Sequence, residues 1–398
     1  MKQIETFTST YTADVSGVPS ALYELGGMTI MHDASGCNST YNTHDEPRYY
    51  DSKSMVFISA LSEVEAIMGD DQKLVDDIVK AANELKPRFI AIAGTPIPMI
   101  TGCDIEGNAK VIEEETGIPT LGISTNGMHS YVEGAGEALL QYGKRFIKAK
   151  DQNIKNQNKS HINVNILGAT PIDFSINGQI QSIEKFLTDN GMNVLSNFAL
   201  NCNVENMSLA SNADVNLVIS SVGIKLAEYM LSVYDIPYVV GVPYGDKLKL
   251  DIIDALKKAA ECTEPKIIFT TDIDASSKND SMMYIIGESI TSKSLAKYIF
   301  SKFGFAPKVI SGVELGNTYH GEVVKTLKLR PRVALEETDF FSEDEDEIKN
   351  IIKNAKLVIA DPLYKPIVPD DTIFIENPHE GFSGRLYRKQ MLNLIDLL

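Results

Sequence analysis

Residues 71–94, DQKLVDDIVKAANELKPRFIAIAG, combine an amphipathic segment with a short apolar run directly after it. Four apolar residues of the first segment recur at helical spacing and define one face: Leu74, Ile78, Ala82 and Leu85. The run RFIAIAG, 88–94, has the near-continuous apolar character of a strand that is buried on both faces. A helix that leads at once into such a strand predicts a βαβ unit and a mainly parallel sheet.

The same alternation of apolar runs and amphipathic segments continues along the chain in three series. The predicted strands are 28–33, 54–59, 88–94 and 119–124 in the first series; 161–168, 192–198, 215–220 and 237–241 in the second; and 266–271, 281–288, 307–313, 332–337, 356–361 and 372–377 in the third. A polar stretch without periodicity, 148–160, reads as a linker after the first series.

This pattern predicts an α/β protein with three Rossmann-like parallel-sheet domains around a central cleft. The domains are expected at 1–150, 161–262 and 263–398, the last with a C-terminal helix. In open parallel sheets, ligands bind beyond the carboxyl ends of the strands. Candidate site residues are therefore sought directly after each predicted strand.

Charge and hydropathy exclude several classes of partner. The 398 residues contain 37 Lys and Arg against 54 Asp and Glu, a net charge of −17, which argues against nucleic acid as a partner. No apolar run reaches the roughly 18–20 residues that span a bilayer, and the first residues are too polar for a signal peptide. We therefore expect a cytoplasmic protein with no membrane partner. The acidic block SEDEDE, 342–347, is expected to open a helix, where the helix dipole favours negative charge.

Two of the four cysteines follow a glycine in a loop after a predicted strand. Cys37 lies in HDASGCNSTYNTHDEPRYY, 32–50, where Gly36 is expected to give the tight backbone that exposes the thiol. Cys103 lies in GTPIPMITGCDIEG, 94–107, whereas Cys202 and Cys262 are interpreted as structural. From the residues alone, the first loop is either a metal site or a polar surface loop with one buried thiol.

Five segments together resemble the nitrogenase component 1 family, and the resemblance spans essentially the whole chain. They are HDASGC (32–37), similar to the family's Gly-Cys loop; the run 59–127; the pair VNILGATPIDFSINGQIQSIEKFLTDNGMNV (164–194) and VNLVISSVGIKLAEYMLSVYDIPYVVGVPYG (215–245); and FIENPHEGFSGRLY (374–387), similar to its His-Gly-Phe region. The resemblance implies three α/β domains that hold a redox cofactor.

Departures from the family pattern argue against dinitrogen reduction. Where the family has a second cluster cysteine this chain has Thr95, and Cys103 stands where the family usually has aspartate. The cysteine that binds the family's catalytic cofactor aligns with Ser220, or with Ser221. His379 is a loose counterpart of the family's histidine ligand.

The resemblance implies a [4Fe–4S] cluster at a subunit interface. Such a cluster takes about four ligands, and two chains that each give Cys37 and Cys103 would supply them in a homodimer. In a heterodimer, a paralogous subunit would supply the remaining ligands, and Asp33 or Asp104 could add a carboxylate. The segment GESITSKS, 287–294, lacks the second glycine of a P-loop. ATP hydrolysis would therefore belong to a separate ATP-dependent iron–sulfur reductase.

The leading functional hypothesis is a reductase that passes electrons from this cluster to an unknown substrate in the cleft. Candidate residues of the cleft, as proton donors or substrate contacts, are His44, Arg48, Asn126, His129 and His379. For each of them, a hydrogen-bonded structural role is the alternative. The competing functions are a non-enzymatic scaffold or carrier for a metal cofactor, and a plain binding protein made of Rossmann units.

Overall fold

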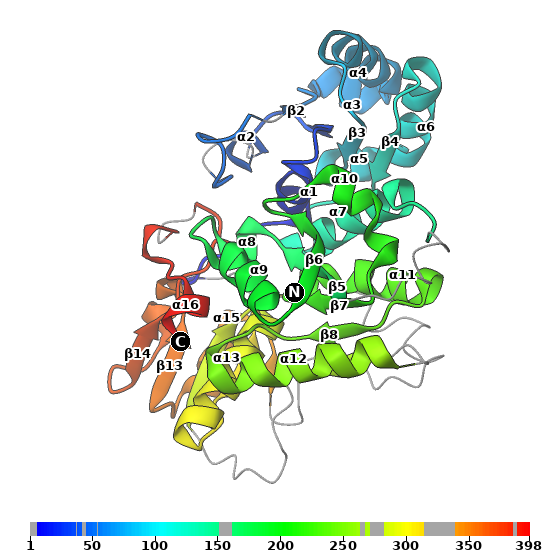
Figure 1. The fold of residues 1–398 in the computed structure, drawn as a ribbon. Coiled ribbons are helices and arrows are strands. Elements are labelled where there is room, and N and C mark those ends of the chain that lie inside the picture. Colours follow the sequence, from blue (N-terminus) through cyan, green and yellow to red (C-terminus); the bar gives the residue numbers. More distant parts are fainter. Residues whose placement is uncertain are drawn as a thin grey trace.

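Every strand described in this computed structural model is paired in parallel, and the strands form three sheets (Figure 1). The structure describes residues 6–36, 38–41, 45–53, 55–150, 161–262, 267–270, 282–313, 339–384 and 388–398. The α/β class with parallel sheets is thus confirmed. The sheets do not themselves define domain boundaries, so the division at residues 150 and 262 stays a prediction.

The first sheet has four strands in the order β2-β1-β3-β4 and forms the upper part of Figure 1. Its strands are β1 (Met28–Met31), β2 (Met55–Ile58), β3 (Ile90–Ala93) and β4 (Thr120–Ile123). The helices along this part of the chain are α1 (Asp14–Leu22), α2 (Asn38–Tyr41), α3 (Glu63–Met68), α4 (Asp71–Leu85), α5 (Pro96–Thr101), α6 (Ile105–Thr116) and α7 (Tyr131–Phe146).

The second sheet has five strands in the order β6-β5-β7-β8-β9. Its strands are β5 (Ile162–Ala169), β6 (Met192–Ala199), β7 (Val215–Val218), β8 (Tyr238–Val240) and β9 (Ile267–Phe269). Its helices are α8 (Pro171–Phe174), α9 (Gln179–Asp189), α10 (Val204–Ser208), η2 (Ala210–Asn212), η3 (Ser221–Gly223), α11 (Ile224–Tyr234) and α12 (Gly245–Glu261).

The third sheet also has five strands, in the order β12-β11-β10-β13-β14. Its strands are β10 (Met283–Gly287), β11 (Lys308–Ser311), β12 (Phe340–Phe341), β13 (Leu357–Ala360) and β14 (Ile373–Glu376). The helices along this part of the chain are α13 (Ser289–Phe303), α15 (Glu345–Ile352), η5 (Pro362–Ile367), η6 (Arg388–Gln390) and α16 (Leu394–Leu397), which packs against α9 of the second unit.

Two of the detailed predictions are wrong. The strand expected at 266–271 is β9, which pairs with β8 at the edge of the second sheet and not with the third. Leu85 was expected on the buried face of α4, but its side chain is 45% exposed and Val75 is buried in its place. The acidic block is confirmed as a helix start, because Asp344 caps α15 and Glu345 lies in its first turn. The run predicted as a strand at 332–337 lies outside the described residues.

The apolar core is continuous between the sheets. Helix α7 links them, because its buried residues Tyr131, Ala135 and Leu139 belong to the same cluster as strand residues of both the first and the second sheet. Gly17 of α1 allows this helix to pack closely, since a Cβ atom there would lie 2.3 Å from the carbonyl oxygen of Tyr131. The sheets are therefore held in fixed relation, which lets residues from different sheets form one site.

Candidate functional site

Each sheet has one point at which consecutive connections leave in opposite directions, and polar residues follow the strands there. These switch points lie between β1 and β3, between β5 and β7, and between β10 and β13. In open parallel sheets, ligands bind in the crevice outside the carboxyl ends of the strands at such points. The three switch points are therefore the places at which a site is expected.

At the first switch point, His32 follows β1 and Thr95 follows β3. The Thr95 hydroxyl donates a 2.8 Å hydrogen bond to the carbonyl oxygen of His32, and both side chains are buried. Nδ1 of His32 lies 2.8 Å from Oγ of Ser59, which follows β2. Burial lowers the pKa of His32, so its ring is neutral at neutral pH. Thr95, predicted near a cofactor, thus ties the two loops together.

Cys103 lies beside a histidine and an aspartate, two residue types that can bind metal. One ligand atom each from His32, Asp71 and Cys103 lies within 4.8 Å of the others. The amide of Asn108 lies 3.5 Å from Sγ of Cys103 and donates to it. Burial and the nearby carboxylate of Asp71 raise the pKa of the Cys103 thiol to about 12. Cys103 was predicted as a ligand; the positions of His32 and Asp71 beside it were not.

The other predicted residues of the first loop are only partly described. Cys37 and His44 lie outside the described residues. Gly36 is exposed and has open space around it, and the residue with left-handed backbone is Ser35, with φ of 83°. The tight turn expected at Gly36 is thus one residue earlier. Asp33 accepts a hydrogen bond from the amide of Asn38.

Arg48, predicted to be catalytic, is buried in a network of its own. Its guanidinium forms ion pairs with Glu46 at 2.7 Å and with Glu24 at 2.9 Å. It also donates to the carbonyl oxygens of Ser20, at 2.7 Å, and Ala199, at 3.1 Å. Because these bonds fix α1 against the first loop and the end of β6, Arg48 serves the fold.

His129 lines a cavity of about 820 Å³ between the loops of the first and third sheets. The walls come from segments that follow strands of the first and third sheets and from an early segment of the chain: residues 8–13, Tyr41, 127–130, Gly312, Glu343, Tyr364 and Ser383. Residues 10–14 form antiparallel bridges on both sides, from Ala13 to Ser130 and from Tyr11 to Phe382. Of the described residues predicted for the cleft, His129 lines this cavity, and Arg48, Asn126 and His379 do not.

His379 lies behind this cavity in a buried network that joins all three sheets. Its Nδ1 accepts a 2.9 Å hydrogen bond from the backbone amide of Gly381, and its Nε2 lies 3.5 Å from Oδ1 of Asp173. The hydroxyl of Tyr131 donates to the same Asp173 oxygen at 2.6 Å. Thr170 donates to the other oxygen at 2.8 Å. Because Nδ1 accepts this hydrogen bond, a ring proton is carried at Nε2, which at 3.5 Å from Asp173 makes no hydrogen bond with a described residue.

The family's cofactor cysteine would align with Ser220 or Ser221. The hydroxyl groups of both serines already donate hydrogen bonds to neighbouring residues. The Ser220 hydroxyl is fully buried and donates to the carbonyl oxygen of Gly168 at 2.8 Å. Ser221 donates from its backbone amide and its hydroxyl to Oε1 of Glu288, which caps α13. Burial and the nearby Asp173 raise the pKa of Glu288. These packed oxygen groups do not fit a thiolate-held metal cluster.

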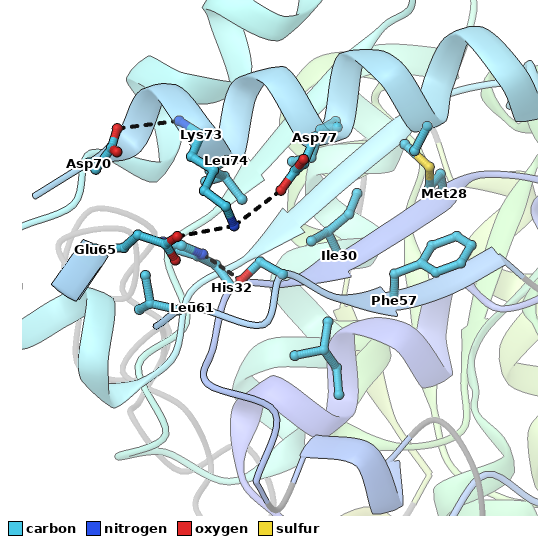
Figure 2. Close-up of a pocket in the computed structure, with 14 residues that line it drawn as sticks. Met28, Ile30, His32, Phe57, Leu61, Glu65, Asp70, Lys73, Leu74 and Asp77 are labelled. Carbon is cyan, nitrogen blue, oxygen red and sulfur yellow. Dashed lines mark hydrogen bonds and ion pairs between the residues drawn. The ribbon is translucent and has the colours of Figure 1, made fainter. Parts of the chain in front are cut away.

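A smaller pocket of about 220 Å³ lies between the first sheet and α4 (Figure 2). Its walls are mostly apolar, with His32 and Ser59 at one end. Figure 2 shows Lys73 reaching from α4 to Glu65 and Asp77, at 3.1 and 3.4 Å. The charge of Lys73 is thus already balanced.

Beside Cys103, helices α3 and α5 contact each other and expose a row of large apolar side chains. The exposed residues, here called the α3–α5 surface, are Val64, Ile67, Met68, Ile97, Met99 and Ile100. Ile100 is 77% exposed and Ile67 is 75% exposed. Exposed apolar side chains on two neighbouring helices are a feature of interaction surfaces.

Asp71, Tyr131 and Asp173 were missed as site residues. Asp173 and Tyr131 follow β5 and β4, so the rule that selected His129 could have found them. Asp71 begins α4 and follows no strand directly, so only the fold brings it to Cys103.

Comparison with known proteins identifies relatives across most of the chain. The family described as nitrogenase component 1 type oxidoreductase matches residues 25–305. A nitrogenase iron-molybdenum cofactor biosynthesis protein NifE from Methanosarcina barkeri is 24% identical over 212 residues, 52% of this chain and 44% of the relative. One subunit of the light-independent protochlorophyllide reductase from Tetradesmus obliquus is 23% identical over 237 residues, 56% of this chain and 44% of the relative.

Solved structures share the fold over the full chain. Nitrogenase Cp1 at pH 6.5 superposes with a TM-score of 0.66 at 16% identity, covering 100% of this chain and 93% of that one. In sequence, the chain spans less than half the length of the curated relatives described above. Across the described ranges, no helix has the length and apolar character needed to cross a bilayer.

Proposed function

Because the chain belongs to the nitrogenase component 1 type oxidoreductase family, we propose that it is a subunit of a nitrogenase-like reductase. It would receive electrons from a separate ATP-dependent iron–sulfur protein through a [4Fe–4S] cluster at a subunit interface. The substrate would be a molecule other than dinitrogen, bound in the cavity between the first and third sheets.

The observation that carries this proposal is the position of Cys103 beside the α3–α5 surface. A second subunit that covers this apolar surface would bring its own cysteines toward the same edge. Two chains that each contribute Cys37 and Cys103 supply the four thiolates that a cubane cluster takes. Either a second copy or a paralogous subunit meets this requirement.

The packing at Ser220 supports the exclusion of dinitrogen as the substrate. The family's catalytic cofactor requires a thiolate there, and this chain offers two hydroxyl groups that are already bonded to Gly168 and Glu288.

The 820 Å³ cavity is the proposed substrate site, and His129 is the proposed proton donor in its wall. His379 does not line this cavity; we assign it to the network with Asp173, where it positions the loop that ends at Ser383. Tyr11 connects the cavity with the Asp173 network, since it lines the cavity and the centroid of its ring lies 5.6 Å from that of the His379 ring.

The test is the iron and acid-labile sulfide content of anaerobically purified protein, with EPR spectra of the reduced form. Wild type, Cys37→Ala and Cys103→Ala are compared with Cys202→Ala, a half-buried cysteine in the loop before α10. We expect about four irons per pair of chains in wild type and in Cys202→Ala. Cys37→Ala and Cys103→Ala should lose the EPR signal. Equal iron in all four proteins would overturn the proposal.

A second candidate is a non-enzymatic scaffold for a metal cofactor, because one of the relatives is named as a cofactor biosynthesis protein. The two candidates differ in turnover. A reductase supplied with the iron–sulfur protein and ATP consumes reductant in proportion to substrate reduced, whereas a scaffold releases an assembled cofactor to an acceptor protein without net consumption.

A further inference from the structure

Three side chains from separate segments of the first sheet unit converge on one point. His32 follows β1, Asp71 is the first residue of α4, and Cys103 lies between α5 and α6. Their ligand atoms all lie within 4.8 Å of one another. Bonds of about 2.0–2.3 Å to one tetrahedral ion place its ligands roughly 3.5 Å apart. The three side chains thus need only a small movement to bind a single ion.

His32 is oriented as a metal ligand. Oγ of Ser59 lies 3.3 Å from the carbonyl oxygen of Asp33, to which it donates, and 2.8 Å from Nδ1 of His32. Because the Ser59 hydroxyl donates its hydrogen bond to Asp33, its oxygen is left to accept one from Nδ1–H of His32. In that tautomer, the free lone pair of the His32 ring is at Nε2. Metal-binding histidines almost always donate their second ring N–H to an oxygen in this way.

The charges around the three residues also point to a cation. Asp71 brings a carboxylate oxygen within 4.8 Å of the Cys103 sulfur and of a ring nitrogen of His32. Lys73 is on the same helix as Asp71, but its ammonium group is held between Glu65 and Asp77. A bound cation would supply positive charge beside the thiol and let it ionise.

We propose that His32, Asp71 and Cys103 bind one divalent transition-metal ion within a single chain. One nitrogen, one carboxylate oxygen and one sulfur suit zinc, ferrous iron or cobalt, and not calcium or magnesium, which take oxygen ligands. Three protein ligands leave a fourth position open for water or a small molecule. His32 is also in the wall of the 220 Å³ pocket, so a ligand in that pocket would lie beside the ion (Figure 2).

This inference goes beyond the proposed function, because the single-ion site is complete in one chain and does not use Cys37. Cys103 cannot serve an interfacial cluster and this ion at once. The ion is therefore expected in chains that carry no shared cluster.

The test is a titration of the metal-free full chain with Co²⁺ under anaerobic conditions, followed by visible and near-ultraviolet absorption. We expect one Co²⁺ per chain and a thiolate-to-cobalt charge-transfer band. Cys103→Ser should lose the band, and Asp71→Asn and His32→Gln should each weaken binding at least about tenfold. Cys202→Ala is the matched control and should bind as wild type does. Asp71 is half-buried at a helix start, so Asp71→Asn should keep the fold, as circular dichroism would check.

Two outcomes would overturn the single-ion site: no Co²⁺ binding to wild type, or unchanged affinity in Asp71→Asn. Cys37→Ala separates this inference from the proposed function. If that variant loses iron and sulfide but still binds Co²⁺ with the charge-transfer band, both proposals stand. If it loses Co²⁺ as well, the one-chain site fails while the cluster remains. Stoichiometric Co²⁺ binding by a protein that never holds sulfide would reject the cluster and keep the ion.

Discussion

The hydroxyl group of Tyr131 donates a 2.6 Å hydrogen bond to Oδ1 of Asp173, and Nε2 of His379 lies 3.5 Å from the same oxygen. Tyr131 follows the first sheet, Asp173 follows the first strand of the second, and His379 follows the last strand of the third. One carboxylate therefore interacts with residues from all three sheet units.

Replacing Tyr131 with phenylalanine should lower the free energy of unfolding by about 1–3 kcal/mol, because a buried carboxylate oxygen loses its closest donor. Urea unfolding followed by circular dichroism measures the change. The control is Tyr142→Phe on the same helix, whose hydroxyl makes no hydrogen bond with any described residue. Equal losses in the two variants would show that the bond to Asp173 contributes nothing specific.

Arg48→Met should be strongly destabilising, by about 3–5 kcal/mol, since it leaves Glu46 buried and unpaired. Arg88→Met, which removes an exposed ion pair with Glu205, should cost about 0–1 kcal/mol. The midpoints of chemical unfolding compare the two. If Arg48→Met unfolded like wild type but lost substrate turnover, Arg48 would be catalytic as the sequence suggested, and the structural assignment would be wrong.

A charged side chain on the α3–α5 surface should weaken the association of the subunits. Ile100→Glu places a carboxylate where the partner would bury it, so the subunit affinity should fall at least about tenfold. Sedimentation velocity over a range of concentrations measures this. Leu250→Glu, an equally drastic change at an exposed leucine on α12, is the control and should associate normally. An unchanged dissociation constant in Ile100→Glu would move the interface elsewhere.

Glu228 should make the protein less stable as the pH rises. Burial raises the pKa of Glu228 to about 7, against the opposing effect of Lys225. Between about pH 4.3, where a glutamate ionises in the unfolded chain, and pH 7, the native state holds a proton that the unfolded state has lost. The contribution of Glu228 to stability is therefore full at low pH and falls as the pH rises through this window.

Glu228→Gln should thus raise the free energy of unfolding by about 1–2 kcal/mol at about pH 8 and leave it unchanged at about pH 4. Thermal unfolding at both values tests this, with the exposed Glu261→Gln as control. A gain of the same size at both pH values would show that the effect is not the ionisation of Glu228.

Strand positions could be predicted because strands buried on both faces are continuous apolar runs, as in β3 and β13. The sheet that each strand joins could not be predicted in the same way. The run at β9 is apolar enough for a strand in either the second or the third sheet, and its pairing with β8 depends on packing that no local pattern encodes. The two-residue strand β12 is too short to show any pattern.

For the site, sequence could select residues that follow strands but not the residues they meet. His129 and Cys103 were selected from such positions, and His129 lines the 820 Å³ cavity. Arg48 was selected because a dense group of charges looks the same in sequence whether it faces a ligand or pairs within the fold, and in the structure it pairs with Glu46 and Glu24. Asp71 reaches Cys103 only because α4 and α6 pack on the same face of the first sheet.

The cavity wall near His129 has a consequence for biosynthesis. Residues 10–14 bridge to Ser130 on one side and to Phe382 on the other, with the Thr12 amide bonded to the Gly381 carbonyl at 2.7 Å. During synthesis, residues 10–14 must therefore wait until residues 381 and 382 have been made before this wall can close. Translation that stops before residue 381 would release a polypeptide in which the first and second sheets are available to fold but this cavity stays open on one side.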